Sequence, residues 1–503
     1  MDDDPDEPST TTAPSVEATT PDANGKAEAP VAAQPSSRVW RALGLRRGRT
    51  ARGTRDLTTG SIPKNLLSLA WPIITSNTLR IVDQLADFVW AAWGFGIVAL
   101  AGIGAAQQWS MLAMTGRMGL DTAVRAMVSR AVGAGDHALA SHIALQGFTL
   151  SIAFSAVMGA LGIVLTPLLL RVLGVDDAVI DQANSYLRIQ FVAVSTTGLM
   201  MMGAAILQAS GDSFSPLRVD LVTRVLHLVL SPFLIFGWGI PGFDGMGIAG
   251  AALSNALAGT VGFALLIRIL FGGRSQMHLS FRGYFVDFRM IWRIVRLGTP
   301  AAVTSIERAM GHLVLFMFVA PFGTTTVAAY SIVRRTQTLI NPGGMGMGHA
   351  AGILVGQNLG AGKPRRARLT VTWALGIIIG FNLVSGGLAI AFPRVFMLVF
   401  NPSPELMDIA TVWLRILALS FILTGASMVF GNSFNTAGDT LVPMLVTLVT
   451  IWGVQQPLAY ILPKYTDLGQ YGVAWAAVIG SIARVGIYIP YFIWGPWLKK
   501  KVL

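Results

Sequence analysis

The chain has 503 residues, of which 53% are hydrophobic and only 12% are charged, and its mean hydropathy is +0.60. Because a soluble domain carries about 25% charged residues, this composition predicts a protein of the lipid bilayer. Cysteine is absent and the six histidines show no ligand spacing, which excludes disulfides, thiolate chemistry and a His-rich metal centre. We assign the net charge of +12 to arginines at helix ends rather than to nucleic-acid binding.

Residues 1–57 are predicted to form a disordered cytoplasmic tail, first acidic and then Arg-rich. Residues 1–37 are rich in Asp, Glu, Pro, Ser, Thr and Ala and have no hydrophobic periodicity. They also lack the basic start and apolar run of a signal peptide. Seven arginines follow, at positions 38, 41, 46, 47, 49, 52 and 55. A basic stretch before the first apolar segment holds the N-terminus in the cytoplasm and favours contact with anionic lipid.

Twelve segments are long and apolar enough to cross the ~30 Å hydrocarbon core as helices. The predicted spans are residues 63–92, 97–131, 138–170, 177–209, 214–237, 246–271, 289–320, 325–358, 365–392, 404–436, 441–462 and 471–495. Basic residues concentrate in the tail, in the connections between spans 6 and 7 and between spans 8 and 9, and at the C-terminus. This bias places both termini in the cytoplasm and gives the two six-span halves the same orientation.

The second half of the chain repeats features of the first at an offset of 227 residues. The repeated pairs are Gly133/Gly360, Gly135/Gly362, Gly211/Gly438 and Arg188/Arg415. We therefore predict an all-α integral membrane protein whose twelve transmembrane helices form two six-helix bundles, related by a pseudo-two-fold axis along the membrane normal. The N-lobe is predicted at residues 58–275 and the C-lobe at residues 276–503. The glycines of the first two pairs are expected to form left-handed turns at helix ends.

Residues 352–363 (GILVGQNLGAGK) resemble the signature that closes the eighth helix of the MATE (multidrug and toxic compound extrusion) transporters. Residues 128–136 in the first half, the two Gly-Asp turns before Pro216 and Pro443, and Leu-Gly-Thr-Pro300 match the same family. The resemblance covers about residues 57–496. It implies two bundles that face each other across a central cavity, the export of small organic molecules, and a place in the inner or plasma membrane.

Three ionisable residues share one face of the first span. Arg80, Asp83 and Asp87 are spaced i, i+3 and i+7. Because a charge at bilayer depth costs roughly 2.5–3.5 kcal/mol on insertion scales, these side chains are expected to face a wet cavity or a partner. Asp87 matches the first-helix aspartate of the resembled family, which implies an H+ or Na+ site there, with Asp83 as a further candidate. The alternative is a static ion pair of Arg80 with either aspartate.

The fifth span carries Asp220, Arg224 and His227 at i, i+4 and i+7. Archaeal-type members of the resembled family usually have a second aspartate in this span, which this chain lacks. His227 is a candidate titratable substitute, because imidazole changes charge near neutral pH. The alternative is a histidine hydrogen-bonded between helices. Asp220 and Arg224 are expected in gating or structural ion pairs.

In the seventh span, Glu307 resembles the acidic residue of the family's C-lobe. It is a candidate coupling or substrate carboxylate, and the alternative is pairing with Arg334 or Arg335 of the eighth span. Neither Asp87 nor Glu307 has an acidic counterpart in the other half of the chain, near position 315 or near position 79. The duplication is therefore broken where ionic chemistry is expected.

Arg117, Asp121 and Arg125 form a ladder at i, i+4 and i+8 near the cytoplasmic end of the second span. We expect a salt-bridged gate or a helix staple there, with a substrate site as the alternative.

No nucleotide-binding motif is present, so the energy for transport must come from an ion gradient. We predict a secondary antiporter, not an enzyme, that exports amphipathic organic compounds in exchange for H+ or Na+ by alternating access. No other cofactor and no resident metal are expected, apart from Na+ at Asp87. Its partners would be small-molecule substrates and the lipid bilayer, and we expect a monomer.

Two other functions stay open. A flippase for lipid-linked oligosaccharides, in the same superfamily, would favour arginine-lined cavities and often two extra helices. A membrane scaffold or receptor would not transport at all. Arg80, Arg224 and Arg308 at bilayer depth also leave open an anionic or zwitterionic substrate, in place of the organic cations usual in the resembled family.

Overall fold

The computed structural model describes residues 56–172, 177–238, 243–273, 277–398 and 403–500, without the side chains of residues 88–89, 91–108, 111–112, 172 and 177–183. Nearly all of the predicted tail at residues 1–57 therefore lies outside the described residues. The predicted boundary between the lobes, at residues 275 and 276, also lies outside them.

Regular structure in these ranges is helical throughout. The helices are α2 (Ile62–Gly133), α3 (His137–Val172), α4 (Asp177–Ala209), α5 (Phe214–Phe236), α6 (Ile248–Phe271), α7 (Phe288–Val319), η1 (Ala320–Phe322), α8 (Thr324–Gly360), α9 (Pro364–Ala391), α10 (Pro393–Leu398), α11 (Pro404–Ala437), α12 (Leu441–Leu448), η2 (Val449–Gln455), α13 (Gln456–Tyr465), α14 (Tyr471–Trp494) and η3 (Pro496–Lys499). The third to twelfth predicted spans coincide with helices to within about three residues, and α12, η2 and α13 together form the eleventh.

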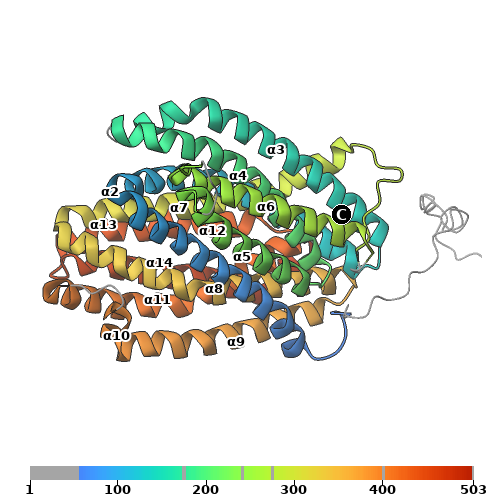
Figure 1. The fold of residues 1–503 in the computed structure, drawn as a ribbon. Helices are drawn as coiled ribbons and strands as arrows, with labels where there is room; N and C mark the ends of the chain where they lie inside the picture. The colour runs from blue at the N-terminus through green and yellow to red at the C-terminus, as the bar shows by residue number, and fades with distance from the viewer. Residues whose placement is uncertain (1–55, 173–176, 239–242, 274–276, 399–402, 501–503) are drawn as a thin grey trace, which may run out of the picture. The chain divides into compact units, whose positions relative to one another are not determined.

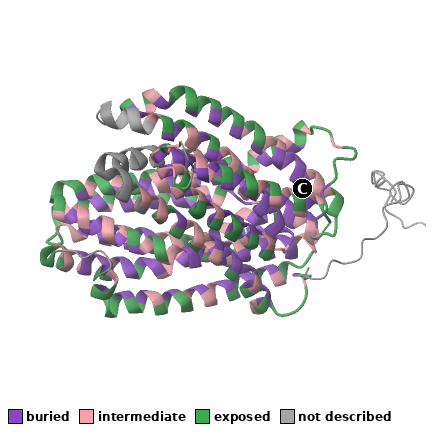
Figure 2. Ribbon diagram, in the orientation of Figure 1, coloured by how far each residue is buried: buried purple, intermediate pink, exposed green. Residues whose placement is uncertain are grey.

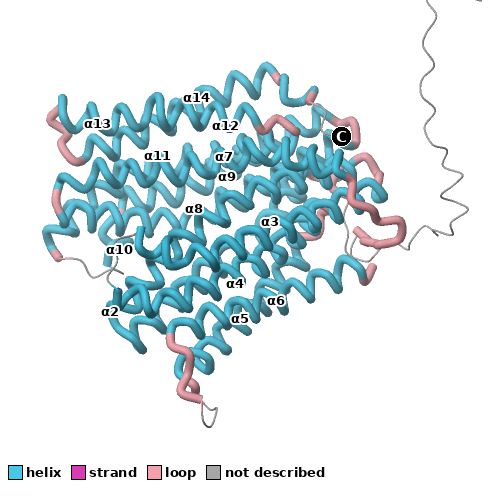
Figure 3. Tube along the Cα trace, turned by 90° about the horizontal axis from the view of Figure 1, so that it is seen from above, coloured by secondary structure: helices cyan, strands magenta, loops and turns pink. Residues whose placement is uncertain are grey.

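The described helices account for twelve membrane crossings in two groups. Nine helical segments of the described residues are long and apolar enough to span a bilayer. The eighth predicted span, α8, is one further crossing. The N-terminal and C-terminal parts of α2, which correspond to the first two predicted spans, complete the twelve crossings. Figure 3 shows α3 to α6 on one side and α11 to α14 on the other, as expected for two six-helix bundles.

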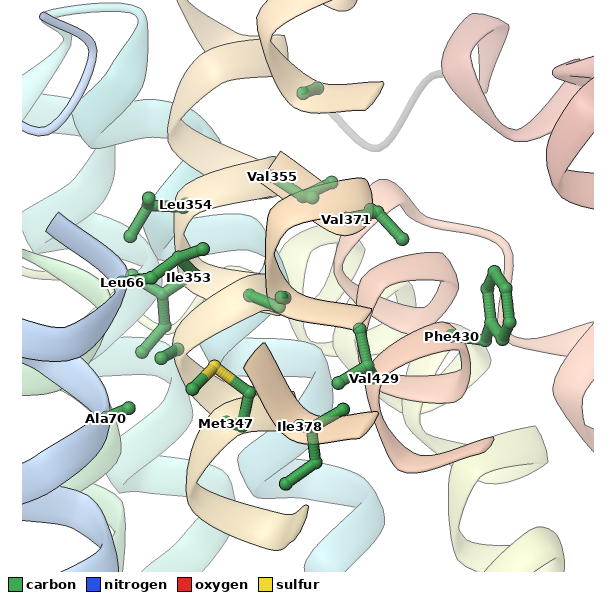
Figure 4. Packing of buried hydrophobic residues seen from close by; sticks show 14 of the residues in the cluster. Leu66, Ala70, Met347, Ile353, Leu354, Val355, Val371, Ile378, Val429 and Phe430 are labelled. Atoms are coloured by element: carbon green, nitrogen blue, oxygen red, sulfur yellow. The ribbon is translucent and has the colours of Figure 1, made fainter. Parts of the chain in front are cut away.

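The first two predicted spans are joined in one 72-residue helix, α2. A straight helix of that length would measure about 108 Å, more than three times the hydrocarbon core. Yet Leu66, near its start, packs in the same core cluster as Ile353 of α8 (Figure 4), and Ser129, near its end, lies against Gly356 of α8. The two ends of α2 are therefore side by side. The prediction of two separate helices is wrong, because the connecting backbone stays helical while the chain reverses direction, but the two legs match the predicted spans.

Large apolar side chains cover the outer faces of the peripheral helices. Exposed examples are Ile152, Val157, Leu161, Val164 and Leu168 on α3, and Leu369, Trp373, Phe381, Leu383, Val384 and Leu388 on α9. Figure 2 shows these exposed stretches along α3 and α9 (labelled in Figure 1), with buried residues gathered between the helices. A water-soluble protein rarely exposes such continuous apolar surface, whereas lipid accepts it.

The two halves of the chain contact each other through reciprocal glycines. Gly133 of α2 lies against the backbone of Gln357 on α8, and Gly360 of α8 lies against the backbone carbonyl of Arg130 on α2. Each contact is the other displaced by the 227-residue offset. Partners that exchange roles in this way are related by a two-fold axis. The predicted pseudo-symmetry is therefore confirmed where α2 crosses α8.

The expected left-handed turns occur at two of the four paired glycines. Gly135 has φ 74° and Gly362 has φ 70°, directly after the ends of α2 and α8. Gly133 and Gly360 are helical instead, so that part of the prediction is wrong. Their missing side chains let two helix backbones cross in contact, which any Cβ atom would prevent.

Asp287 caps the start of α7 and links it to α3. One carboxylate oxygen accepts hydrogen bonds from the backbone N–H groups of Arg289 and Met290 at 3.0 and 3.1 Å, and the other lies 3.3 Å from His142 Nε2. The hydrogen bond from Met290, together with those from His142 and Arg289, holds the pKa of Asp287 below its usual value. Because the folded-state pKa is the lower one, this contribution to stability is complete above the unfolded pKa of about 4 and is lost as the pH falls through the folded pKa.

We expect Asp287→Ala to lower the melting temperature of the purified protein in detergent at pH 7, because a lost helix cap costs about 1 kcal/mol. Asp287→Asn keeps the cap without the charge and should lie between the two. The difference between wild type and Asp287→Ala should shrink as the pH is lowered below 4. Identical melting curves at pH 7 would contradict this assignment.

Candidate ion-coupling site

The carboxylate of Asp83 on α2 is held from two sides by residues of α5. Arg224 Nη1 lies 2.5 Å from Asp83 Oδ2, and His227 Nδ1 lies 2.8 Å from Asp83 Oδ1. All three side chains are almost fully buried. The structure therefore brings together three predicted site residues, and one ring nitrogen of His227 makes the inter-helix hydrogen bond that the alternative foresaw.

Asp87 faces the other ring nitrogen of His227. His227 Nε2 and Asp87 Oδ1 are 3.5 Å apart, and both atoms are buried without a hydrogen-bond partner. An imidazole can satisfy two acceptors at once only when both of its nitrogens carry a proton. His227 is thus placed between two carboxylates so that one additional proton would complete a second charged hydrogen bond.

Arg80 pairs with Asp220 of α5 rather than with an aspartate of its own helix. Arg80 Nη2 lies 3.3 Å from Asp220 Oδ2, and the Asp220 side chain is only 3% exposed. The alternative of a static pair with Asp83 or Asp87 is therefore wrong. Spacing along one helix puts these residues on a common face, but α5 packs on that face and supplies each with a partner from across the helix interface.

We call the six ionisable residues described above on α2 and α5 the N-lobe cluster. Its positive and negative charges are equal in number only when one additional proton is bound. Two of its three carboxylates are matched by its two arginines, which leaves Asp87 unmatched while His227 is neutral. An unmatched charge is costly in a poorly polarisable interior, so a cation that binds beside Asp87 is stabilised. The cluster consists of Arg80, Asp83, Asp87, Asp220, Arg224 and His227.

Arg117 of α2 links this helix to α3 and α4 of the N-lobe through hydrogen bonds. Its guanidinium donates to Asp121 at 3.0 Å, to Ser151 Oγ of α3 at 2.6 Å, and to the backbone carbonyl of Gly198 on α4. The side chain is 2% exposed. These contacts support the predicted helix staple. Arg125, the third member of the predicted ladder, takes part in no salt bridge among the described residues, so the ladder is shorter than predicted.

We expect Arg117→Met to lower the thermal stability of the protein in detergent strongly, because a buried carboxylate left without its partner costs roughly 3–5 kcal/mol. The double variant Arg117→Met/Asp121→Leu should recover most of the loss, since an apolar pair of similar volume replaces the ionic one. Arg394→Met is the control, because Arg394 and Asp408 form a pair whose side chains are 72% and 74% exposed. A loss as large in the control as in Arg117→Met would refute the staple.

Glu307 is buried in α7, and neither of its carboxylate oxygens has a hydrogen-bond partner. The alternative of pairing with Arg334 or Arg335 is wrong, because neither arginine forms a salt bridge within the described part of the chain. Arg334 instead lies 3.0 Å from His312 Nδ1. The charges that act on Glu307 are those of Arg308 and Arg484. The structure therefore places Glu307 in a second charged region, far along the chain from the N-lobe cluster.

Arg484 of α14 was not among the predicted site residues. Its Nε donates to Thr450 Oγ1 at 3.1 Å, next to the C-lobe charges. The signal that singled out Arg80 applies equally to Arg484, which is the one charged residue inside the predicted span 471–495.

Comparison with known proteins gives a consistent result. A family model described as MatE matches residues 72–233 and 300–461, two segments that correspond across the internal repeat to within one residue. The chain is 25% identical over 457 residues to the probable multidrug resistance protein YoeA of Bacillus subtilis, covering 89% of this chain and 97% of that one. It is 22% identical over 413 residues to the FAD transporter of Shewanella oneidensis, covering 82% and 90%. A solved structure, the outward-facing conformation of a multidrug resistance MATE family transporter, superposes with a TM-score of 0.83 at 22% identity over 90% of this chain and 100% of that chain.

Proposed function

Because the chain belongs to the MatE family of multi-pass membrane transporters, we propose that it exports amphipathic organic compounds across the plasma membrane in exchange for protons. The N-lobe cluster carries this proposal. It pairs every charge except that of Asp87 and places an imidazole nitrogen 3.5 Å away from that unmatched carboxylate. One relative is named a probable multidrug resistance protein and another an FAD transporter, which supports a broad substrate range here.

Proton binding would change the packing of α2 against α5. When His227 is protonated, its attraction to Asp87 draws the first leg of α2 towards α5, and release of the proton removes that attraction. A ligand biases two conformations only by its different affinity for them. The proton therefore acts as the ligand that favours one of the two arrangements in an alternating-access cycle, and a substrate in the cavity favours the other.

A proton suits the site better than Na+, which is the alternative coupling ion. Hard cations are bound by several oxygen ligands, whereas a ring nitrogen of His227 lies 3.5 Å from Asp87 Oδ1 and Arg224 is also close by. No further cofactor enters the proposed cycle.

We place both termini in the cytoplasm. Lys363 Nζ donates to the backbone carbonyl of Thr58 at 3.0 Å, and Arg366 Nη2 donates to that of Thr59 at 2.8 Å. The start of α2 and the connection between α8 and α9 thus lie at the same end of the helices. The positive-inside rule assigns that basic end to the cytoplasm.

The proposal is tested with purified protein in vesicles, by following ethidium export under an imposed pH gradient or an imposed Na+ gradient. We expect the pH gradient alone to drive export. Export driven by a Na+ gradient alone would show that the coupling ion is Na+ and not H+. Failure to transport any dye or drug under either gradient would favour the flippase or the scaffold.

A further inference from the structure

A cavity of about 140 Å³ lies in the C-lobe and is lined by residues of α7, α8, α11, η2 and α14. Its charged lining is entirely cationic among the described residues, with Arg308, Arg334 and Arg484 joined by His312. Amide and hydroxyl side chains, including Gln455 and Ser481, make up most of the remaining polar wall. The volume is roughly ten times the ~10–15 Å³ that one water needs on the same measure, so the cavity has room for a group of several atoms.

In the described part of the chain, no carboxylate lies within salt-bridge distance of the three arginines of this cavity. Arg308 Nε is buried without any hydrogen-bond acceptor, Arg334 meets the ring of His312, and Arg484 donates through Nε to a threonine hydroxyl. The partners recorded for Arg334 and Arg484 are therefore neutral groups, and all three arginines line the cavity. All three side chains are partly buried. A guanidinium that is partly removed from water and has no carboxylate partner favours an anion.

The internal repeat explains why this cavity has arginines without matching carboxylates. Residue 300 corresponds to residue 72 in the two matched segments, so Arg308 corresponds to Arg80 and Gly311 to Asp83. At the 227-residue offset of the turns before α5 and α12, Thr447 corresponds to Asp220. The C-lobe has thus kept the arginine and lost both carboxylates.

A direct contact supports this correspondence. In the N-lobe, Asp83 is paired with Arg224. Ile451 corresponds to Arg224, and in the C-lobe Gly311 lies against Ile451. An apolar contact therefore occupies the place of the N-lobe ion pair, so no internal carboxylate reaches the cationic side chains from α12 or η2.

The π-helix η2 (Val449–Gln455) shapes the wall of the cavity. It interrupts an otherwise α-helical span and brings Ile451 and Gln455 to the lining. Directly after it, Gln456 Nε2 donates to the backbone carbonyl of Gly311 at 2.8 Å, which fixes the wider turn against α7. π-Helical turns inside α-helices occur frequently at functional sites.

We propose that this cavity binds the carboxylate or phosphate group of an exported substrate, so that the substrates of this transporter include amphipathic organic anions. Guanidinium groups match both anions through paired N–H donors. The inference rests on the proposed export function, but the binding site itself does not need a gradient. Glu307 interacts with Arg308 and Arg484 but is not among the lining residues, and its single charge balances at most one of the three arginines.

The experiment measures dye binding to the purified protein in detergent, where no gradient exists. Carboxyfluorescein and rhodamine 123 share a xanthene ring and carry opposite charges, and fluorescence anisotropy gives the affinity for each. Ser481 lines the cavity one helical turn before Arg484. Ser481→Asp adds a carboxylate there, and Ser481→Asn is its neutral control of nearly equal size. We expect Ser481→Asp to weaken carboxyfluorescein binding at least about tenfold relative to Ser481→Asn, and to leave rhodamine 123 binding unchanged or tighter.

A second set of variants keeps the test independent of the first. Arg484→Gln should weaken carboxyfluorescein binding to a similar degree, and Arg484→Lys should restore part of it. Arg394→Gln removes one exposed cationic charge outside the cavity and should change nothing. Competition with inorganic phosphate and with benzoate then separates phosphate from carboxylate recognition.

Several outcomes would overturn the anion site. These are equal carboxyfluorescein affinity in Ser481→Asp and Ser481→Asn, full affinity in Arg484→Gln, or parallel loss of both dyes. If carboxyfluorescein binding depends on Arg484 while no gradient drives export, the anion site stands and the antiport proposal fails. If a pH gradient drives ethidium export while the Ser481 and Arg484 variants bind carboxyfluorescein as the wild type does, the antiport proposal stands and the anion site fails.

Discussion

Replacing Asp87 by Asn is expected to reduce export driven by a pH gradient to the level of protein-free vesicles, with the melting temperature of the protein unchanged or raised. Asp87 is the unmatched carboxylate of the N-lobe cluster, and its Oδ1 has no hydrogen-bond partner. The neutral amide fixes the cluster in its charge-balanced form at every pH, so a proton no longer changes the balance. Removal of an unpaired buried charge does not destabilise the fold.

The matched variant Asp83→Asn should behave in the opposite way with respect to stability. It leaves Arg224 buried without its carboxylate, and an orphaned buried charge of this kind costs roughly 3–5 kcal/mol. Thermal unfolding in detergent and dye export in vesicles, measured on both variants, separate the two effects. Full export by Asp87→Asn under a pH gradient would remove Asp87 from the coupling mechanism.

A side chain at Gly360 is expected to force apart the crossing of α2 and α8 and to block the transport cycle. A Cβ atom at Gly360 would meet the backbone carbonyl of Arg130 and the backbone nitrogen of Ala134, and one at Gly133 would meet the backbone of Gln357. Backbone atoms cannot rotate away, and overpacking of this kind typically costs about 1–3 kcal/mol. Since 1.4 kcal/mol is tenfold, Gly360→Ala should shift the equilibrium away from the packed crossing by about one to two orders of magnitude.

The chain contains no cysteine, so the crossing can be followed without any background substitution. Spin labels on Ala134→Cys and Ala361→Cys, the positions that follow α2 and α8, report the distance between the two helix ends. We expect this distance to increase and drug export to fall in Gly360→Ala and in Gly133→Ala. Gly376→Ala in α9 is the control, because nothing lies within 4 Å of its Cβ position. An unchanged distance in both crossing variants would show that the contact does not govern the packed state.

Hydropathy and charge predicted most of the fold. A transmembrane helix must make all of its backbone hydrogen bonds within itself and must present an apolar surface long enough to cross the bilayer. Spans 3 to 12 follow from that rule alone. The connection inside α2 cannot be predicted from this rule, because the backbone remains helical where the chain reverses direction.

The residues of the N-lobe cluster were predicted individually, and their pairing was not. Spacing along one helix identifies residues on a common face, but Arg80 and Asp220 are 140 residues apart and meet only through the packing of α5 on α2. The C-lobe cavity was harder still to predict. Its positive charge depends on the absence of carboxylates at Gly311 and Thr447. Both residues are uncharged, so the sequence gives no sign of a charged site at these positions.

In the proposed cycle, the arginines of the C-lobe cavity would also make the protein sensitive to the membrane potential. A charge that crosses the whole field gains or loses about 2.3 kcal/mol per 100 mV. If Arg308, Arg334 and Arg484 move together through one tenth of the field as the lobes rearrange, the potential contributes about 0.7 kcal/mol per 100 mV to that step. A potential negative on the cytoplasmic side draws the empty, cationic lobe towards the cytoplasm, and a bound anion cancels part of that pull. In the proposed cycle, voltage would thus favour the return of the empty transporter to the side from which its substrate is loaded.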